Sequence, residues 1–172
     1  NSRFYQSFSS EGRERLDRLV PAILKASSNT NNPDTALSRL IFVIQSIGRR
    51  SAYLSLLNEN PLALEQLTRL VNASAEISHW VASNPIILDE LLDPITNFDF
   101  QEHGEIENEI SNKLSVCENH GLEESMDILR HYHQGYNLKI AAADLANIID
   151  FRLVSISLSN LAHAILQKSL SL

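Results

Sequence analysis

Histidine and cysteine side chains are the residues of this chain that could bind a transition metal, but their spacing does not indicate a ligand set. His131 and His133 are two positions apart, about 200° around a helix, so they cannot chelate one ion together. Cys117 and His120 are three positions apart, but the chain has no second cysteine to supply another thiolate. We therefore predict no metal site. His133 falls among apolar positions, and we expect it to be a core histidine.

Two pairs of carboxylates have helical spacing. Asp89 and Asp93 are four positions apart, as are Glu123 and Asp127. Pairs of this kind serve in acid–base catalysis, but only beside a nucleophile or an oxyanion donor, and the sequence indicates neither. Carboxylates spaced by four are common on solvated helix faces. We predict that these four are surface charges and that the chain carries no catalytic residue.

Phosphate-binding motifs are absent from the sequence. It contains no glycine-rich loop and no lysine in a Walker context. Those motifs supply the backbone N–H groups and the positive charge that hold nucleotide phosphates. We therefore predict no cofactor-binding residue in this chain.

The composition is that of an ordinary globular protein. Hydrophobic residues make up 44% of the 172 positions and charged residues 20%. The net charge of -7 argues against sequence-independent binding of nucleic acid, which needs a clustered basic surface. A single cysteine fits a reducing compartment, and no apolar run reaches the roughly 20 residues that span a bilayer. We expect a cytoplasmic protein that binds neither nucleic acid nor membrane.

An asparagine-proline step occurs three times, each time where a helix is expected to begin: Asn32–Pro33, Asn60–Pro61 and Asn84–Pro85. Asparagine is a preferred N-cap, and the fixed φ and missing N–H of proline suit the first helical position. The last two steps belong to a near-repeat of a short helix, an Asn-Pro corner and a second amphipathic helix. In the second copy this helix has a wide apolar face and ends at Pro94. We predict that the two corners stack.

Helical periodicity continues through the second half of the chain, after an aperiodic stretch at 95–103. The spacing predicts a helix over 104–119, the longest helix over 122–148, and a last helix capped by Ser155. In the first half, Gly48 either ends a helix or weakens one. No segment alternates like a strand. The fold class is therefore all-α: a multi-helix bundle of about 8–9 helices with two stacked helix-AsnPro-helix corners and one long helix.

Three phrases along the chain read RRSAYLSLLNENPLALEQLTRL, NPIILDELLDP and NLKIAAADLANI. Together they resemble the bacterial glutamine synthetase adenylyltransferase family. The resemblance runs from about Glu14 to Leu166 and matches the helical middle of the family, between its two nucleotidyltransferase domains. The chain begins at Asn1 and its only methionine is Met126, which fits a piece of a longer protein.

This resemblance implies an activity for the parent enzyme. The family transfers AMP from ATP to a tyrosine of glutamine synthetase and removes it again by phosphorolysis, and the PII signalling protein and glutamine tune which reaction proceeds. Its catalytic domains carry a spaced pair of aspartates that hold two magnesium ions against the ATP phosphates. This chain has no such Asp-x-Asp pair. We expect it to be inactive alone, with ATP and magnesium as cofactors of the parent enzyme only.

The same resemblance divides the chain into functional ranges. Residues 1–9 are expected to be a linker and 10–96 a helical regulatory or linker region. Residues 104–172 are expected to be a helical segment that leads into the C-terminal nucleotidyltransferase domain, which this chain lacks. The expected partners are glutamine synthetase, the PII protein and the flanking nucleotidyltransferase domains.

Four cations are the candidate contact residues: Arg49, Arg50, Arg130 and Lys139. The two adjacent arginines stand in the RRSAYL phrase of the family, and Lys139 replaces its usual arginine before IAAAD. These cations either pair with acids such as Asp144 on helix surfaces or contact a flanking domain or regulatory partner. The sequence also fits a second class of function, a free-standing helical adaptor that binds a partner through its Asn-Pro corners.

Overall fold

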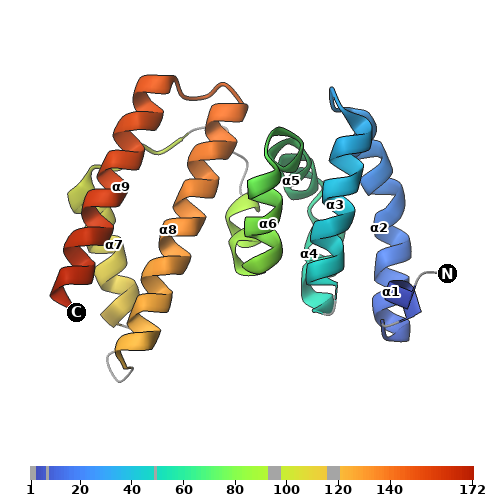
Figure 1. Cartoon of the computed structure of the whole chain (residues 1–172), viewed down its shortest axis with the longest axis horizontal. Coiled ribbons are helices and arrows are strands. Elements are labelled where there is room, and N and C mark those ends of the chain that lie inside the picture. The colour runs from blue at the N-terminus through green and yellow to red at the C-terminus, as the bar shows by residue number, and fades with distance from the viewer. Residues whose placement is uncertain (1–2, 7, 49, 93–97, 116–120) are drawn as a thin grey trace. The chain divides into compact units, whose positions relative to one another are not determined.

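The computed structural model describes residues 3–6, 8–48, 50–92, 98–115 and 121–172 (Figure 1). All regular structure within these ranges is helical, without a strand, which confirms the predicted all-α class. The nine α-helices and one 3-10 helix found there agree with the predicted number. The chain divides into two compact units, Asn1–Pro94 and Ile95–Leu172. Within the described ranges, no helix combines the length and the apolar character that crossing a membrane requires.

Seven helical segments make up the described part of the first unit: α1 (Arg3–Gln6), α2 (Ser10–Ser28), α3 (Pro33–Ile47), α4 (Ser51–Glu59), α5 (Pro61–Ala73), α6 (Ala75–Ser83) and the 3-10 helix η1 (Pro85–Leu91). Helix α3 packs against α2, α5 and α6, and α2 also packs against α4. The core consists mainly of fully buried leucine and isoleucine side chains: Leu19, Leu40, Ile47, Leu54, Leu57, Leu67, Leu70, Ile87, Leu88 and Leu91. Burial of each contributes about 1.5–3 kcal/mol.

The Asn-Pro steps begin helices as predicted, but their asparagines do not act as N-caps. Asn32, Asn60 and Asn84 share φ near -130° and ψ between 71 and 81°, extended backbone that a following proline enforces. None of the three side chains accepts a hydrogen bond from the helix that follows. Instead, the Asn60 amide donates to the carbonyl oxygen of Leu56 at 2.8 Å, and that of Asn84 donates to Trp80 at 3.5 Å. Each of these two asparagines therefore secures the end of the helix before its corner.

The second corner leads into a 3-10 helix instead of the expected α-helix. With three residues per turn, side chains at i and i+3 eclipse one another. Pro85, Leu88 and Leu91 accordingly form one buried row, while the row that starts at Ile86 is exposed. The apolar face of this segment is therefore narrower than predicted. Pro94, its predicted end, lies outside the described residues.

Gly48 follows α3 directly and makes room for the ring of Phe8. Its backbone, at φ -62° and ψ -23°, is one that any residue adopts, so its conformation does not require glycine. A Cβ atom at this position would lie only 2.6 Å from Cε1 of Phe8 and 2.8 Å from the carbonyl oxygen of Ile44. Gly48 thus ends α3, one of its two predicted roles. It also lets the ring of Phe8, which is 7% exposed, pack within the first unit.

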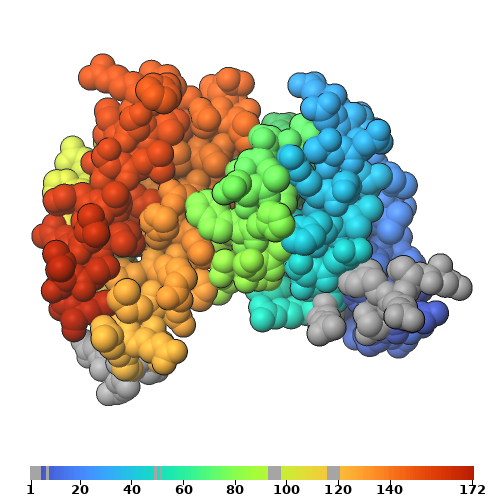
Figure 2. All heavy atoms as spheres, in the orientation of Figure 1, coloured from blue at the N-terminus to red at the C-terminus, as the bar shows by residue number. Residues whose placement is uncertain are grey.

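The second unit is described as three helices: α7 (His103–Ser115), α8 (Leu122–Leu145) and α9 (Phe151–Ser171). Helix α9 packs against both α7 and α8, and the atoms of α8 and α9 are in contact along much of their length (Figure 2). One apolar cluster joins the three helices: Ile106, Ile110, Leu129, Tyr136, Ile140, Ala143, Ile149, Leu161 and Ala164.

The turn between α8 and α9 differs from the sequence prediction. Helix α8 ends at Leu145, before the predicted end at 148, and Asn147 adopts a left-handed φ of 55° that no helix continues through. The last helix then begins at Phe151. Its N-cap is Asp150, whose Oδ1 accepts a hydrogen bond from the backbone N–H of Leu153 at 2.8 Å. The prediction that Ser155 caps this helix was wrong, because the aspartate caps it earlier.

Candidate functional site

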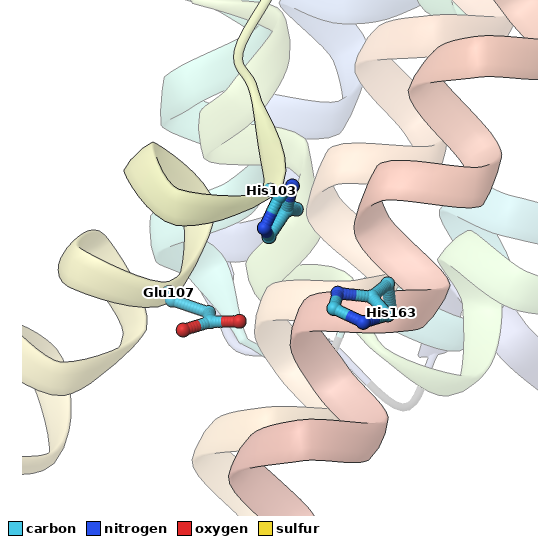
Figure 3. Close-up of side chains that lie close together, drawn as sticks. All are labelled: His103, Glu107 and His163. Atoms are coloured by element: carbon cyan, nitrogen blue, oxygen red, sulfur yellow. The ribbon is translucent and has the colours of Figure 1, made fainter.

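Two histidines and a glutamate converge between α7 and α9. His103 is the first residue of α7, Glu107 lies one turn further along the same helix, and His163 faces them from α9 (Figure 3). Two imidazole nitrogens and one carboxylate oxygen, one from each residue, all lie within 4.8 Å of one another. The two imidazole ring centroids are 4.9 Å apart, with the planes at 86°. Among the described residues, this is the group whose donor atoms could share one metal ion.

Hydrogen bonds at the start of α7 fix its position against α9. The side chain of Asn160, three residues before His163, donates to the carbonyl oxygen of Gln101 at 3.1 Å. Within the first turn of α7, the Glu105 carboxylate accepts a hydrogen bond from the backbone N–H of Glu102 at 2.9 Å. This is the glutamate half of a capping box. The two bonds hold the residues that lead into α7 and so place its first side chain beside α9.

Glu107 contributes an unsatisfied carboxylate oxygen to this group. Its Oε1 atom is buried and has no hydrogen-bond partner in the described part of the chain. A buried polar atom without a partner costs about 1–3 kcal/mol, and more when it carries charge. The side chains of His103 and His163 are exposed. The group therefore combines a buried anionic oxygen with two imidazoles that solvent can reach.

The sequence indicates only two of the three residues of this metal-binding group. His103 and Glu107 are four positions apart, which places them on one face of a helix. Nothing in the sequence relates that pair to His163, because the contact depends on how α9 packs against α7. Side chains four positions apart are also common on helix surfaces without any metal.

The predicted histidine and cysteine pairs lie elsewhere. His131 and His133 are on α8, and His133 is half-buried, where desolvation lowers its pKa. The amide nitrogen of Asn137 lies 3.1 Å from Nε2 of His133. Cys117 and His120 lie outside the described residues.

The predicted carboxylate pairs give no shared acid–base site where both members are described. Asp127 forms an ion pair with Arg130, on the next turn of α8. Burial, followed by the charge of the neighbouring Glu90, raises the pKa of Asp89. Its predicted companion Asp93 is outside the described residues.

The four predicted contact residues are distributed over both units. Arg49 lies outside the described residues, and Arg50 is exposed directly before α4 in the first unit. Arg130 and Lys139 are exposed on α8 in the second unit. Because they are nine positions apart, they lie about 14 Å apart along the helix axis and about 180° apart around it. Arg130 and Lys139 therefore face different directions and cannot contact one small patch together.

Comparison with known proteins identifies relatives across nearly the whole chain. The family model described as "Glutamate-ammonia ligase adenylyltransferase" matches residues 64–172. A bifunctional glutamine synthetase adenylyltransferase/adenylyl-removing enzyme from Thioalkalivibrio sulfidiphilus is 41% identical over 97% of this chain and 17% of its own length. Enzymes of the same name from Nitrosococcus oceani and Pseudomonas aeruginosa are 36% and 39% identical, over 97% and 94% of this chain. The chain spans about a sixth of the length of these curated relatives.

Proposed function

Because the chain belongs to the glutamate-ammonia ligase adenylyltransferase family, we propose that it is the central, non-catalytic helical portion of an enzyme that adenylylates and deadenylylates glutamine synthetase. The observation that carries this proposal is the match of 97% of the chain to 17% of a bifunctional relative. The parent enzyme transfers AMP from ATP, with magnesium, to a tyrosine of glutamine synthetase, and it also removes the AMP. It acts in the cytoplasm and controls nitrogen assimilation.

The makeup of the chain supports a role in connecting and regulating catalytic domains. The described residues form helices around apolar cores. The sequence also lacks the paired aspartates with which nucleotidyl transfer of this kind holds magnesium. The chemistry of the parent enzyme is therefore assigned to other domains, and this chain alone is proposed to be inactive.

The division of the chain suggests how such a portion acts. We assign residues 10–96 to a regulatory or linker region, and 104–172 to the helical segment that leads into the C-terminal nucleotidyltransferase domain. A helical portion between two opposed active sites can favour one of them by changing how domains pack. A coupling of about 1–3 kcal/mol is typical for such a two-state device. The PII protein and glutamine are the proposed effectors.

Four cations are the proposed contacts to flanking domains or to the PII protein: Arg49, Arg50, Arg130 and Lys139. The exposure of Arg50 before α4 and of the other two described cations on α8 supports this assignment. Side chains of this type contribute to binding chiefly through charge complementarity, which sets the association rate and its salt dependence.

An NMR titration tests the regulatory part of the proposal. The isotopically labelled chain is titrated with purified PII protein and, separately, with glutamine. We expect chemical-shift changes concentrated in residues 10–96 for at least one of the two. Arg50→Glu should weaken the PII response about tenfold. Arg69→Glu, which changes another exposed arginine, on α5, is the matched control and should leave the response unchanged. A chain that responds to neither effector would contradict the regulatory assignment.

A further inference from the structure

We propose that His103, Glu107 and His163 bind a divalent transition-metal ion, with zinc as the fitting occupant, and that this ion links α7 to α9. The function proposed above assigns no metal to this portion of the enzyme, so the site is additional to it. The inference rests on the donor set, on the buried carboxylate oxygen and on how firmly the two helices are held.

The donors are close to the separation that a single ion requires. Zinc binds imidazole nitrogen and carboxylate oxygen at about 2.0–2.2 Å, so donors around a tetrahedral zinc ion are about 3.4 Å apart. The three donor atoms here already lie within 4.8 Å of one another. The remaining difference is at most about 1.4 Å, a shift that rotation about the side-chain torsions can supply. Figure 3 shows the three side chains converging on the space between the two helices.

Glu107 gives an independent indication of a cation. Its Oε1 atom is buried without a hydrogen-bond donor in the described structure. A cation bound by this carboxylate would balance its negative charge. It would also sit between the two imidazole rings, whose neutral nitrogens are good ligands for zinc.

The helices that carry the ligands are held together without the ion. Ile106 on α7 and Leu161 on α9 are almost fully buried in the same apolar cluster. The hydrogen bond from Asn160 to the Gln101 carbonyl joins α9 to the segment directly before α7, close to the site. An ion that binds here meets a preorganised backbone, so little of its binding free energy is spent on ordering the helices.

The ligand types select the class of metal. Imidazole suits zinc, copper, nickel and iron, whereas magnesium and calcium prefer sites made of oxygen donors only. Three protein ligands leave the fourth tetrahedral position open, and the exposure of both histidines lets water occupy it. The proposed role of this ion is structural: it links α7 to α9. We propose no reaction at this site.

Calorimetric titration of zinc into the metal-stripped 172-residue chain tests the proposal. We expect one ion per chain, a rise of at least about 5 °C in the melting temperature with saturating zinc, and a cobalt-substituted form with tetrahedral visible absorption. His163→Ala should weaken binding about 100-fold or more. Glu107→Gln should weaken it similarly while leaving the metal-free chain folded, because the side chain keeps its size and shape. His131→Ala, an exposed histidine on α8, should bind zinc as the wild type does.

Two results would overturn the proposal. One is the absence of zinc binding by the folded chain at millimolar concentration. The other is binding that His163→Ala and Glu107→Gln leave unchanged, which would place the ion elsewhere. Circular dichroism of each variant verifies that its helices are intact. Both variants should fold, because His163 is exposed and because Glu107→Gln keeps the size of the side chain.

Discussion

Asn160 on α9 donates a side-chain hydrogen bond to the carbonyl oxygen of Gln101, 59 positions earlier in the chain, at 3.1 Å. This bond connects the segment before α7 to the last helix of the second unit. It satisfies a carbonyl group that precedes the helix and has no place in a helical ladder. The start of α7, and with it His103, is thereby held next to α9.

Asn160→Ala removes this bond and should lower the free energy of unfolding by about 1 kcal/mol, because the Gln101 carbonyl loses its partner. Urea denaturation followed by circular dichroism measures the change. Ser159→Ala is the control: this exposed neighbour bonds only within α9, and its loss should cost less than about 0.5 kcal/mol. Equal stabilities for the two variants would contradict the linking role of Asn160.

Arg39 on α3 should be the most costly cation to remove from the first unit. Its Nη1 donates to the carbonyl oxygens of Val71 and Asn72, at 2.7 and 2.9 Å. Both carbonyls belong to the last turn of α5, where no helical N–H is available to them and a positive charge is favourable. Arg39→Ala should reduce the free energy of unfolding by about 1.5–3 kcal/mol, measured by chemical denaturation.

The matched control for this prediction is Arg69→Ala, on the exposed face of α5. It should change stability by less than about 0.5 kcal/mol. A cost for Arg39→Ala as small as that of the control would show that the two carbonyls are satisfied equally well by water.

Gly48→Ala should destabilise the first unit through the ring of Phe8. The added Cβ would lie too close to Cε1 of the ring and to the Ile44 carbonyl, and overpacking of this kind costs about 1–3 kcal/mol. Thermal unfolding measures the loss. In a double-mutant cycle, Phe8→Ala should remove much of the cost of Gly48→Ala. Gly104→Ala, where a Cβ would meet open space, is the control.

The outcome that contradicts this account is full additivity of the two changes. Additive losses would mean that Phe8 and Gly48 do not touch. Gly48 would then be needed only as the residue that ends α3.

Tyr136 should make the second unit sensitive to alkaline pH. Burial raises its pKa from 10.0 to about 12, and the carboxylates of Glu109, Asp99 and Glu105 add to the effect. Between pH 10 and pH 12 the unfolded chain loses the phenolic proton while the folded chain keeps it. The free energy of unfolding therefore falls as pH rises through this range, and the contribution is fully present below pH 10.

Tyrosine absorbance during a pH titration detects this group. Tyr136→Phe should remove a titration step at about pH 12 and flatten the alkaline loss of stability. Tyr53→Phe, in the first unit, is the control variant. A titration in which Tyr136→Phe removes a step near pH 10 would contradict the effect of burial.

Hydrophobic periodicity and Asn-Pro steps predict most of the helices. The details of their caps and ends are not predicted by these local patterns. Asn-Pro steps fix where α3, α5 and η1 begin, because proline restricts the residue before it. The asparagine side chain can accept a hydrogen bond from the helix that follows or donate one to a carbonyl of the helix before it. The N-cap rule considers only the first of these two bonds. Hydrophobic periodicity likewise does not distinguish a short 3-10 helix such as η1 from an α-helix. It also does not show whether α9 begins after Asp150 or after Ser155.

The candidate site was less predictable than the fold. The spacing of His103 and Glu107 is visible in the sequence, but the approach of His163 is a property of the α7–α9 interface. The position of Gln101, which Asn160 holds, is equally non-local. Long-range contacts of this kind leave no periodic trace in a single sequence. Three of the four candidate cations, Arg49, Arg50 and Lys139, stand in phrases of the family, and the partner contacts of all four stay a prediction.

AMP transfer is the measurement that tests the central claim most directly. The purified 172-residue chain is incubated with unmodified glutamine synthetase, radiolabelled ATP and magnesium, and the label incorporated into glutamine synthetase is counted. A full-length relative, such as the Pseudomonas aeruginosa enzyme, serves as the positive control. We predict incorporation by the relative and none by this chain. Incorporation by the chain itself, at a rate proportional to its concentration, would contradict the account of a non-catalytic central portion.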